Sequence, residues 1–564
     1  MGAVVRVTAS MCLLAVGACG SDESASPAPV ATATATPQAA ALTPANGEAA
    51  AYADTRLSLA FDTAPVLTGQ GAIRVYRADG TLVDTIDPGS ANVLAGGETQ
   101  TALGSYNTEI DKIGNNVASL TQYRFTYYRP VTIAGKVATI KLHDGVLAPN
   151  TSYYVQVDAN AFNGAFAGNS TFPGITGATA WTFKTKASPT SATSVTVDDD
   201  GSADFRSVQG ALDYMMATGC LSCANASAAK TITVKNGTYD EQLFLRNVSN
   251  LTIQGESRAG TVIQNSNWDA FNPGTGGSRA TANTTLSNIG GASTLGNRRA
   301  LGGGRPVFLV EGGDLLRLTN FTLRNTHAKD ATQNSQAETI YFNSANINGS
   351  RLIATNMNFL SNQDTVQVKG WVWIYNSLIA GDVDYVWGSP FAVALENDEL
   401  RTVVDTVAPT SGGYVFQSRA AKGFPGFVVL GGALTAEAGV PAGSTYLARS
   451  GGLYQAAGYC TTAPTLGVSL GNPQIYCDNV AYVGVTMGAH VATTGWFTNP
   501  VPNLAPTATE GWRESGSLSA AGTPLDVSGR VKTYATTGAD LSGLNTRAKI
   551  FAAWNNGVGW SPQP

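Results

Sequence analysis

Residues 352–395, LIATNMNFLSNQDTVQVKGWVWIYNSLIAGDVDYVWGSPFAVAL, decide the fold. Glycine and asparagine punctuate this stretch, and it contains short runs rich in strand-forming residues with no long helix between them: 352–357, 365–368, 372–375 and 391–395. Similar runs begin near residue 193 and recur at spacings of roughly twenty to thirty residues. This pattern predicts a right-handed parallel β-helix over residues 193–564, in which successive coils stack and align side chains from distant positions.

Residues 43–187 have a different sequence pattern. Apolar and polar residues alternate in short predicted strands, which are separated by turn signals. Leu57, Leu59 and Phe61 alternate with small or polar residues, and Ala78-Asp79-Gly80 marks a hairpin. Strands at this spacing predict a β-sandwich. The segments 147–158 (LAPNTSYYVQVD) and 181–184 (WTFK) resemble bacterial Ig-like domains of the S-layer type. That resemblance implies a spacer or a weak binding module.

Residues 1–19 are expected to be a lipoprotein-type signal peptide that directs export. Arg6 precedes a short apolar run that ends at Val16-Gly17-Ala18-Cys19, which resembles a bacterial lipobox with Cys19 as the acylated residue. An ordinary signal peptide cut nearby is the alternative. Residues 20–42 are rich in Pro, Ala and Thr and are expected to be a linker. We therefore expect an exported protein, either extracellular or held at the bacterial outer membrane by a lipid anchor.

Composition restricts the chemistry. Charged residues make up 13% of the chain and the net charge is −5, which argues against nucleic acid as a partner. The three histidines, His143, His327 and His490, stand beside no recognisable nucleophile or metal-ligand pattern. The chemistry is therefore expected among carboxylates.

Four cysteines follow the predicted export signal. An even number in an exported protein favours disulfides, and we expect the pairs Cys220–Cys223 and Cys460–Cys477. Cys220-Leu-Ser-Cys223 has the spacing of a redox pair, but it follows an apparent helix instead of opening one. A structural disulfide is the preferred interpretation.

A series of motifs between residues 193 and 555 resembles the pectinesterases (pectin methylesterases, carbohydrate esterase family 8). The motifs occur in the order seen in that family: 194–211 (SVTVDDDGSADFRSVQGA), 237–241 (GTYDE), 336–337 (QA), 362–365 (NQDT), 381–388 (GDVDYVWG), 446–449 (YLAR), 487–491 (MGAHV) and 495–496 (GW). The family fold is the parallel β-helix. The aspartates at 198–200 coincide with the start of the family's domain and lack the distal bidentate Glu of a calcium loop, so we expect a structural role there.

The spacing of the polar residues suggests chemistry on its own terms. Asp364 and Asp384 are 20 residues apart, about one coil, so they are expected on neighbouring coils. Two adjacent carboxylates do not both ionise easily, and the split supplies one acid and one nucleophile. Gln336 and Gln363 are 27 residues apart and are expected to form an oxyanion hole. Arg449 is expected to hold Asp384 in its ionised form.

The resemblance implies matching roles. Asp384 would attack the ester carbonyl of a methyl-esterified galacturonate, and Asp364 would protonate the departing methanol and then activate water. Gln363 and Gln336 would stabilise the oxyanion. No metal or organic cofactor is implied, the partner is pectin, and a monomer is expected.

Two departures from the family concern sugar binding. The family follows its arginine with Pro-Trp, whereas Arg449 is followed by Ser450-Gly451-Gly452. The family often has Tyr at the position of Gln367. We expect Trp387, Trp371 and Gln367 to contact substrate in place of the missing tryptophan.

Other functions fit parts of the pattern. An altered sugar platform is compatible with a different ester, such as an acetylated sugar or an acyl thioester. A non-catalytic surface β-helix that binds polysaccharide is the alternative outside enzymes, and the intact set of Gln363, Asp364, Asp384 and Arg449 argues against it. A polysaccharide lyase would need a calcium cluster and a basic proton acceptor.

Overall fold

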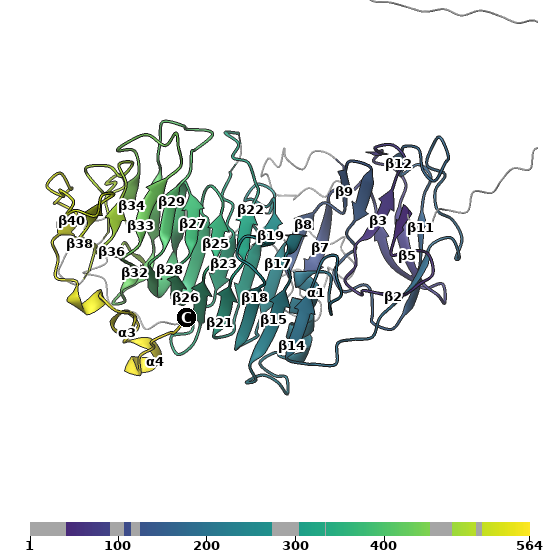
Figure 1. The fold of residues 1–564 in the computed structure, drawn as a ribbon, viewed down its shortest axis with the longest axis horizontal. Coiled ribbons are helices and arrows are strands. Elements are labelled where there is room, and N and C mark those ends of the chain that lie inside the picture. Colours follow the sequence, from purple (N-terminus) through teal and green to yellow (C-terminus); the bar gives the residue numbers. More distant parts are fainter. Residues whose placement is uncertain are drawn as a thin grey trace, which may run out of the picture.

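The computed structural model describes residues 41–90, 106–113, 124–272, 304–332, 334–451, 476–503 and 510–564. Two bodies are visible in Figure 1, a smaller β-sandwich near the N-terminus and a long stack of strands that runs to the C-terminus. The predicted export signal, Cys19 and almost all of the predicted linker lie outside the described residues.

The N-terminal body is built from two sheets around one apolar core. One sheet has the antiparallel order β1 (Leu42–Thr43), β3 (Leu57–Ala60), β10 (Val137–Ile140), β9 (Val131–Ala134). The other has the order β2 (Glu48–Ala51), β13 (Thr182–Thr185), β11 (Ser152–Val157), β5 (Ile73–Arg77), β6 (Leu82–Ile86). Leu57, Leu59 and Phe61 are buried, so their alternation does mark an inward face. The predicted sandwich is confirmed as an architecture, and the Ig-like resemblance stays a prediction.

Smaller elements complete this body. The strands β4 (Val66–Leu67) and β12 (Phe162–Asn163) pair with each other. An antiparallel pair, β7 (Glu109–Ile113) and β8 (Arg124–Tyr128), lies toward the long stack in Figure 1.

The long body is a parallel β-helix, as predicted, with three stacks of strands. The first stack runs in the order β14 (Ser194–Val197), β15 (Lys230–Val234), β18 (Leu251–Gly255), β21 (Leu316–Thr319), β24 (Arg351–Thr355), β26 (Val366–Tyr375), β28 (Val383–Glu396), β32 (Gly426–Leu430), β36 (Val480–Val483), β38 (Trp512–Ser515), β40 (Ala535–Thr537). All of these neighbours pair in parallel. Coils that stack in this way bury a continuous core, which no single coil could form alone.

The second stack has nine parallel strands: β16 (Gly237–Asp240), β19 (Thr261–Asn265), β22 (Thr322–Asn325), β25 (Asn358–Leu360), β27 (Leu378–Gly381), β29 (Glu399–Thr402), β33 (Ala433–Ala436), β37 (Thr486–Met487) and β39 (Leu518–Ser519). The third stack consists of β17 (Leu243–Arg246), β20 (Phe308–Glu311), β23 (Ile340–Asn343), the first halves of β26 and β28, β30 (Tyr414–Ser418) and β34 (Tyr446–Ser450). The long strands β26 and β28 therefore turn from the third stack into the first.

Asparagines mark the turn between the first and second stacks. Asn320, Asn356, Asn376 and Asn397 have φ of 64°, 54°, 50° and 56°. Asparagine is one of the few residues that adopt this left-handed conformation readily. The Asn356 side chain donates to Oδ1 of Asn320 at 2.7 Å, which links neighbouring coils along the turn.

Helix α1 (Val208–Thr218) covers the first coil and is fixed at its N-terminus by two carboxylates. Its buried face packs into the core of the β-helix. Glu241 accepts hydrogen bonds from the backbone N–H groups of Val208 and Gln209 at 2.9 and 2.8 Å. Asp54, from the sandwich, accepts from the backbone N–H and the hydroxyl of Ser207 at 2.7 and 2.8 Å. Both carboxylates satisfy N–H groups that the helix leaves unpaired.

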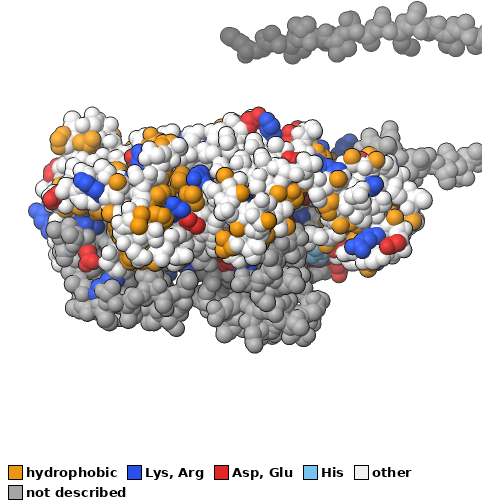
Figure 2. All heavy atoms as spheres, turned by 90° about the horizontal axis from the view of Figure 1, so that it is seen from below, with side chains coloured by type: hydrophobic (Ala, Val, Ile, Leu, Met, Phe, Trp, Pro, Cys, Tyr) orange, Lys and Arg blue, Asp and Glu red, His pale blue; other side chains and the backbone are white. Residues whose placement is uncertain are grey.

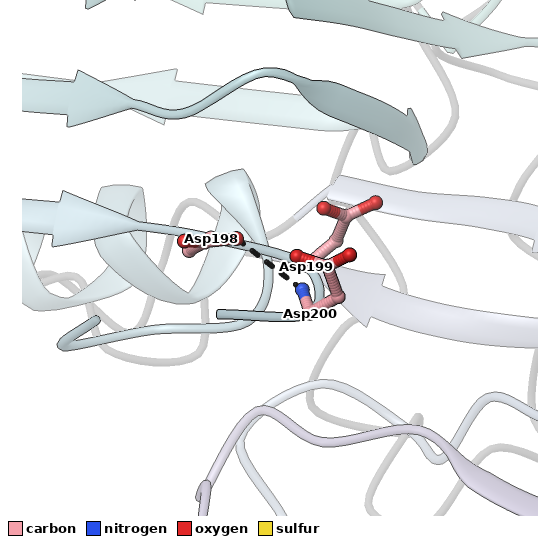
Figure 3. A group of neighbouring side chains, drawn as sticks. All are labelled: Asp198, Asp199 and Asp200. Carbon is pink, nitrogen blue, oxygen red and sulfur yellow. Dashed lines mark hydrogen bonds between the residues drawn. The ribbon is translucent and has the colours of Figure 1, made fainter. Parts of the chain in front are cut away.

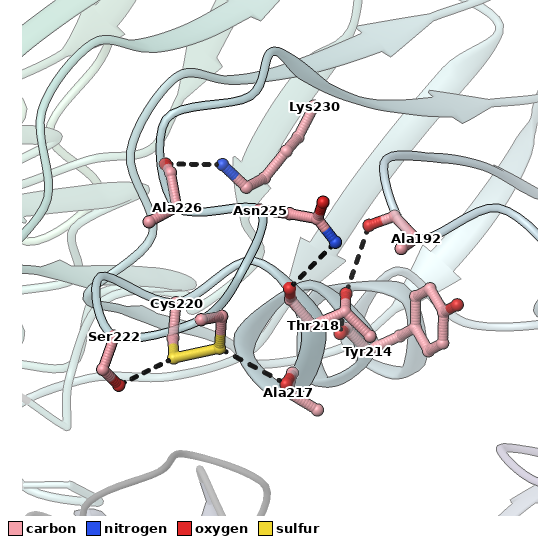
Figure 4. The surroundings of a disulfide bond; sticks show 10 residues. Ala192, Tyr214, Ala217, Thr218, Cys220, Ser222, Asn225, Ala226 and Lys230 are labelled. Carbon is pink, nitrogen blue, oxygen red and sulfur yellow. Dashed lines mark hydrogen bonds between the residues drawn. A yellow bond between two sulfur atoms is a disulfide. The ribbon is translucent and has the colours of Figure 1, made fainter.

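The predicted disulfide between Cys220 and Cys223 is present just after helix α1 (Figure 4). The predicted pair Cys460–Cys477 is not described, because Cys460 lies outside the described residues. Within the described ranges no helix is both long and apolar enough to cross a membrane. The face in Figure 2 shows mainly uncharged atoms with scattered charged side chains, as the low charged fraction predicts.

We predict that Asp54→Ala destabilises the docking of the two bodies. The substitution removes the carboxylate that accepts from the backbone N–H and the hydroxyl of Ser207, the N-cap residue of α1, and loss of a hydrogen bond to a charged group costs about 1.5–3 kcal/mol. Differential scanning calorimetry is expected to show a lower unfolding midpoint for the transition of the β-helix. Asp200→Ala, which removes an exposed carboxylate nearby, is the control. Equal midpoints for the two variants would contradict the capping role.

Candidate active site

The candidate site lies on the outer surface of the third stack. Gln367, Trp387, Gln417 and Arg449 are in register on successive strands and form one column. Their neighbours Val366, Val386, Phe416 and Ala448 form the adjacent column and belong to the β-helix core. Because successive side chains of a strand point to opposite faces, the polar column points outward.

Asp364 and Asp384 stand immediately before this column, on neighbouring coils as predicted. The Asp364 N–H donates to the carbonyl of Val383 at 2.9 Å, which aligns the two segments. Both aspartates have left-handed backbone conformations, with φ of 64° and 51°. Outliers of this kind cluster at functional sites because the surrounding structure must enforce them. Both carboxyl groups are buried.

Asp384 has a cation of its own. Arg449 donates from Nε to Oδ1 at 2.8 Å and from Nη2 to Oδ2 at 2.5 Å, and Gln417 donates to Oδ2 at 2.6 Å. Burial raises the pKa of Asp384, and the bonds from Arg449 and the charge of Arg419 oppose that rise. The two-pronged pair confirms the predicted partnership of Arg449 and Asp384 and favours the carboxylate.

Asp364 must share its cation. Arg305 donates to Asp364 at 3.1 Å, but the same guanidinium also pairs with Asp269 at 3.0 Å and Glu338 at 2.6 Å. All four side chains are buried. Burial raises the pKa of Asp364 well above its ordinary value, and the charges of Glu338 and Asp384 add to the rise while Arg305 opposes it. One cation among three carboxyl groups therefore favours a proton on Asp364.

The two carboxyl groups differ in environment in the way that acid and nucleophile roles need. Asp384 keeps a dedicated arginine, whereas Asp364 competes with two other carboxyl groups for one. We assign the charge to Asp384 and the proton to Asp364. An ionised carboxylate can attack a carbonyl carbon, and a neutral carboxyl can protonate a leaving oxygen.

Gln336 and Gln363 also lie on neighbouring coils. The two residues form a parallel bridge, and the Ala337 N–H donates to the Gln363 carbonyl at 3.1 Å. Gln363 directly precedes Asp364, so both amides belong to the coils that carry the acid. Oε1 of Gln336 is buried and has no hydrogen-bond partner among the described residues. The predicted adjacency is confirmed, and the role of the two amides as oxyanion donors stays a prediction.

Three side chains at the site were missed by sequence reasoning: Arg305, Gln417 and Arg419. Arg419 donates to Oε1 of Gln417 at 2.6 Å and thereby orients the amide that donates to Asp384. Gln417 follows Trp387 by one coil length, so the coil repeat could have indicated it. Arg305 belongs to none of the recognised motifs, and only the folded coils bring it beside three carboxyl groups.

The glycine at residue 451, in the segment where the sequence departs from the family, packs closely against two side chains of the site. A Cβ atom at Gly451 would lie 3.2 Å from Nε of Arg419 and 3.2 Å from Oε1 of Gln417. Contacts this close would force the neighbours to move. The absence of a side chain at residue 451 therefore leaves space for the Arg419–Gln417 pair.

The predicted substrate contacts differ in accessibility. Trp371 is fully buried beneath the C-terminal segment, where its ring contacts Phe391, Phe424 and Phe551. The prediction that Trp371 binds sugar is therefore wrong. Trp387 is 5% exposed and lies near Arg305 and Arg419, whose guanidinium carbons are 5.5 and 5.1 Å from its ring centroid. Gln367 is buried beside it in the column, and substrate contact by these two residues stays a prediction.

The aspartates at 198–200 lie close together directly after strand β14, at the start of the β-helix (Figure 3). Asp198 accepts hydrogen bonds from the backbone N–H groups of Gly201 and Asp200 at 2.9 and 3.3 Å. Asp199 accepts from the Thr238 N–H at 3.3 Å. These bonds agree with the turn role that we expected.

Comparison with known proteins finds no matching family model. A pectinesterase from Ralstonia solanacearum is 26% identical over 269 residues, which cover 44% of this chain and 61% of that protein. The chain thus spans about three fifths of the length of this curated relative. Among solved structures, a pectin methylesterase in complex with a hexasaccharide is 19% identical, with a TM-score of 0.44 over 64% of this chain and 97% of its own. A pectin methylesterase from Erwinia chrysanthemi is 18% identical, with a TM-score of 0.44 over 66% and 100% of the two chains. One from carrot is 18% identical, with a TM-score of 0.43 over 66% and 95%.

Proposed function

We propose that this chain is a carboxylic ester hydrolase that removes methyl groups from esterified homogalacturonan (pectin) and releases methanol. The observation that carries the proposal is the pair Asp364 and Asp384, buried on adjacent coils with unequal access to cations. The similarity to a pectinesterase from Ralstonia solanacearum supports pectin as the substrate.

In the first half of the proposed reaction, the Asp384 carboxylate attacks the ester carbonyl carbon. The C=O π electrons move onto oxygen, and the amides of Gln336 and Gln363 are proposed to stabilise this oxyanion. When the carbonyl re-forms, the C–O bond to methoxide breaks and Asp364 gives its proton to the leaving oxygen. Methanol departs and a galacturonyl–Asp384 anhydride remains.

In the second half, Asp364 is a carboxylate and acts as a base. It takes a proton from water while the water oxygen attacks the galacturonyl carbon. The C–O bond to Asp384 breaks, the Asp384 carboxylate is restored, and the new carboxylic acid group loses its remaining proton to solvent as galacturonate. Arg449 and Gln417 stabilise the departing carboxylate by the same bonds that hold it at rest.

The proposed place of action rests on the signal peptide expected at residues 1–19. We propose that the protein is exported and meets pectin outside the cytoplasm, with Cys19 as the site of a lipid anchor. The apolar run before Cys19 supports this proposal.

Asp384→Asn is expected to abolish methanol release from highly methylated pectin. The amide keeps the shape of the side chain but removes the nucleophile, so kcat should fall by at least about 10⁴-fold. Methanol is measured on purified protein, with folding checked by circular dichroism. Asp398→Asn removes another buried carboxyl group, at the turn before β29, and is expected to keep the wild-type rate. Activity of Asp384→Asn within a few-fold of wild type would refute the assignment.

Asp364→Asn is expected to slow methyl ester hydrolysis by about 10²–10⁴-fold, because methoxide then leaves without a proton. The loss should be smaller for a p-nitrophenyl ester that the wild type also hydrolyses, because nitrophenolate leaves without protonation. The two substrates are compared by the burst of leaving group, which reports the first half of the reaction. Equal losses of rate on the two substrates would contradict the role of Asp364 as the acid.

If the wild type hydrolyses acetyl or thioester substrates but not pectin, the broader esterase function replaces the pectin-specific one.

Arg449→Gln is expected to move the acid limb of the pH–rate profile to higher pH. Asp384 must be ionised to attack, so kcat/KM rises as pH passes through its pKa. Arg449 lowers that pKa through its hydrogen bonds and its charge, so its removal raises the pKa of Asp384 further. The profile is measured for methanol release between pH 4 and 9. An unmoved acid limb would contradict the pairing of Arg449 with the ionising group.

A further inference from the structure

The sandwich domain reaches the candidate site through the side chain of Asn272. The Tyr127 backbone N–H, on strand β8, donates to Oδ1 of Asn272 at 2.7 Å. The Asn272 amide nitrogen donates back to the Tyr127 carbonyl at 2.9 Å. One side chain thus satisfies both backbone groups of a strand residue, as a neighbouring strand would. Tyr127 and Asn272 are both buried.

From Asn272 a buried amide network continues into the β-helix. Its nitrogen also donates to Oδ1 of Asn267 at 2.9 Å. Asn267 donates to the carbonyls of Gly304 and Pro306 at 2.6 and 3.0 Å, which fixes the backbone on both sides of Arg305. Asn325 donates to the carbonyls of Asn267 and Glu338 at 2.6 and 3.0 Å.

The same segment supplies a direct partner of Arg305. Asp269 lies three residues before Asn272, and its carboxylate pairs with Arg305 at 3.0 Å. The Asp269 N–H donates to the Gln336 carbonyl at 3.0 Å. Arg305 in turn donates to Asp364. The Tyr127 backbone is therefore hydrogen-bonded to the segment 267–272, which supplies the Arg305 partner Asp269 and bonds to the backbone carbonyl of Gln336.

A stack of rings follows the same route. The Trp268 ring lies 5.0 Å from Phe271 and 4.3 Å from His327, nearly parallel to both. Arg129, which follows strand β8, lies over Phe271 at 5.9 Å. The His327 carbonyl accepts a hydrogen bond from Asn362 at 2.9 Å, next to Gln363. Packing and hydrogen bonding thus lead from the sandwich to the same pair of coils.

We infer that the sandwich domain is part of the catalytic unit, with Asn272 as a positioning residue that holds Arg305, and through it the acid Asp364, in place. This inference rests on the proposed function for its kinetic consequences. It assigns to the N-terminal body a task beyond that of a spacer.

A second contact between the two bodies provides a matched comparison. Asp54 also joins the sandwich to the β-helix, but its partners are Arg206 and Ser207 at the start of α1. Among the described residues, the hydrogen bonds of its side chain lead to the start of the helix and to none of the site residues. A variant at Asp54 therefore removes a contact between the two bodies that shares no residue with the Asn272 route.

The test compares Asn272→Ala with Asp54→Ala in the full-length protein. Asn272→Ala is expected to lower kcat for methanol release roughly tenfold with KM within about twofold, because the acid is displaced while substrate binding remains. Its alkaline limb should also move to lower pH. Without the Asn272 side chain, Asp269 is expected to move away from Arg305. Arg305 is then neutralised by fewer carboxylates, so it lowers the pKa of Asp364 more strongly and Asp364 loses its proton at lower pH. Asp54→Ala should keep the wild-type kcat and alkaline limb.

Hydrogen–deuterium exchange gives a readout that does not depend on activity. Asn272→Ala should speed exchange in strands β20 and β23, which begin shortly after Arg305 and Glu338 respectively. Asp54→Ala should leave exchange in these strands unchanged. If the wild type proves inactive on pectin, the proposed function fails while this comparison still decides the positioning role. Unchanged exchange in these strands, or equal kinetic effects of the two variants, would overturn the inference. If Asn272→Ala does not fold, Asn272→Asp, which keeps the acceptor for Tyr127 and loses both donated bonds, is expected to give the same pattern, and a wild-type pattern would overturn it.

Discussion

The parallel backbone pairing of Val366 with Val386 is the interaction on which the site depends. It fixes the register between two coils, and through that register Asp364 faces the segment of Asp384 while Gln367 and Trp387 fall into one column. A shift by one residue would turn each of these side chains to the opposite face of the stack. The apolar residues on the inner face enforce the register, since Val366 and Val386 are both in the core. Packing inside the β-helix therefore sets the distances between groups outside it.

Electrostatics then distinguishes two chemically identical side chains. Asp384 is paired with the guanidinium of Arg449 and accepts a hydrogen bond from the Gln417 amide. Asp364 shares the guanidinium of Arg305 with Asp269 and Glu338. Buried charges must be paired, and a cluster with fewer cations than carboxyl groups retains protons instead. The sandwich domain connects to the Asp364 side of the site, where charge is least balanced, through Asn272 and Asn267 of the β-helix. These side chains are neutral amides, which can orient a charged cluster without altering its net charge.

The sequence alone predicted the fold class, the adjacency of Asp364 and Asp384 and of Gln336 and Gln363, and the partnership of Arg449 with Asp384. These succeed because each depends on a local motif or on a coil length that can be counted. Arg305 was not predictable, because its importance arises from three carboxyl groups that lie up to 59 residues away. Trp371 was misassigned for a related reason. Its ring contacts Phe551, which is distant in the sequence, so the residues near Trp371 could not indicate that the ring is buried.

Helix α1 affects whether the end of the β-helix can associate with another copy of the protein. The first strands of the stacks, β14, β16 and β17, would otherwise offer unpaired backbone edges and an open apolar interior at the end of the solenoid. Val208, Leu212, Met215 and Met216 of α1 close that interior, and Asp54 and Glu241 keep the helix in place. The cap thereby opposes end-to-end polymerisation.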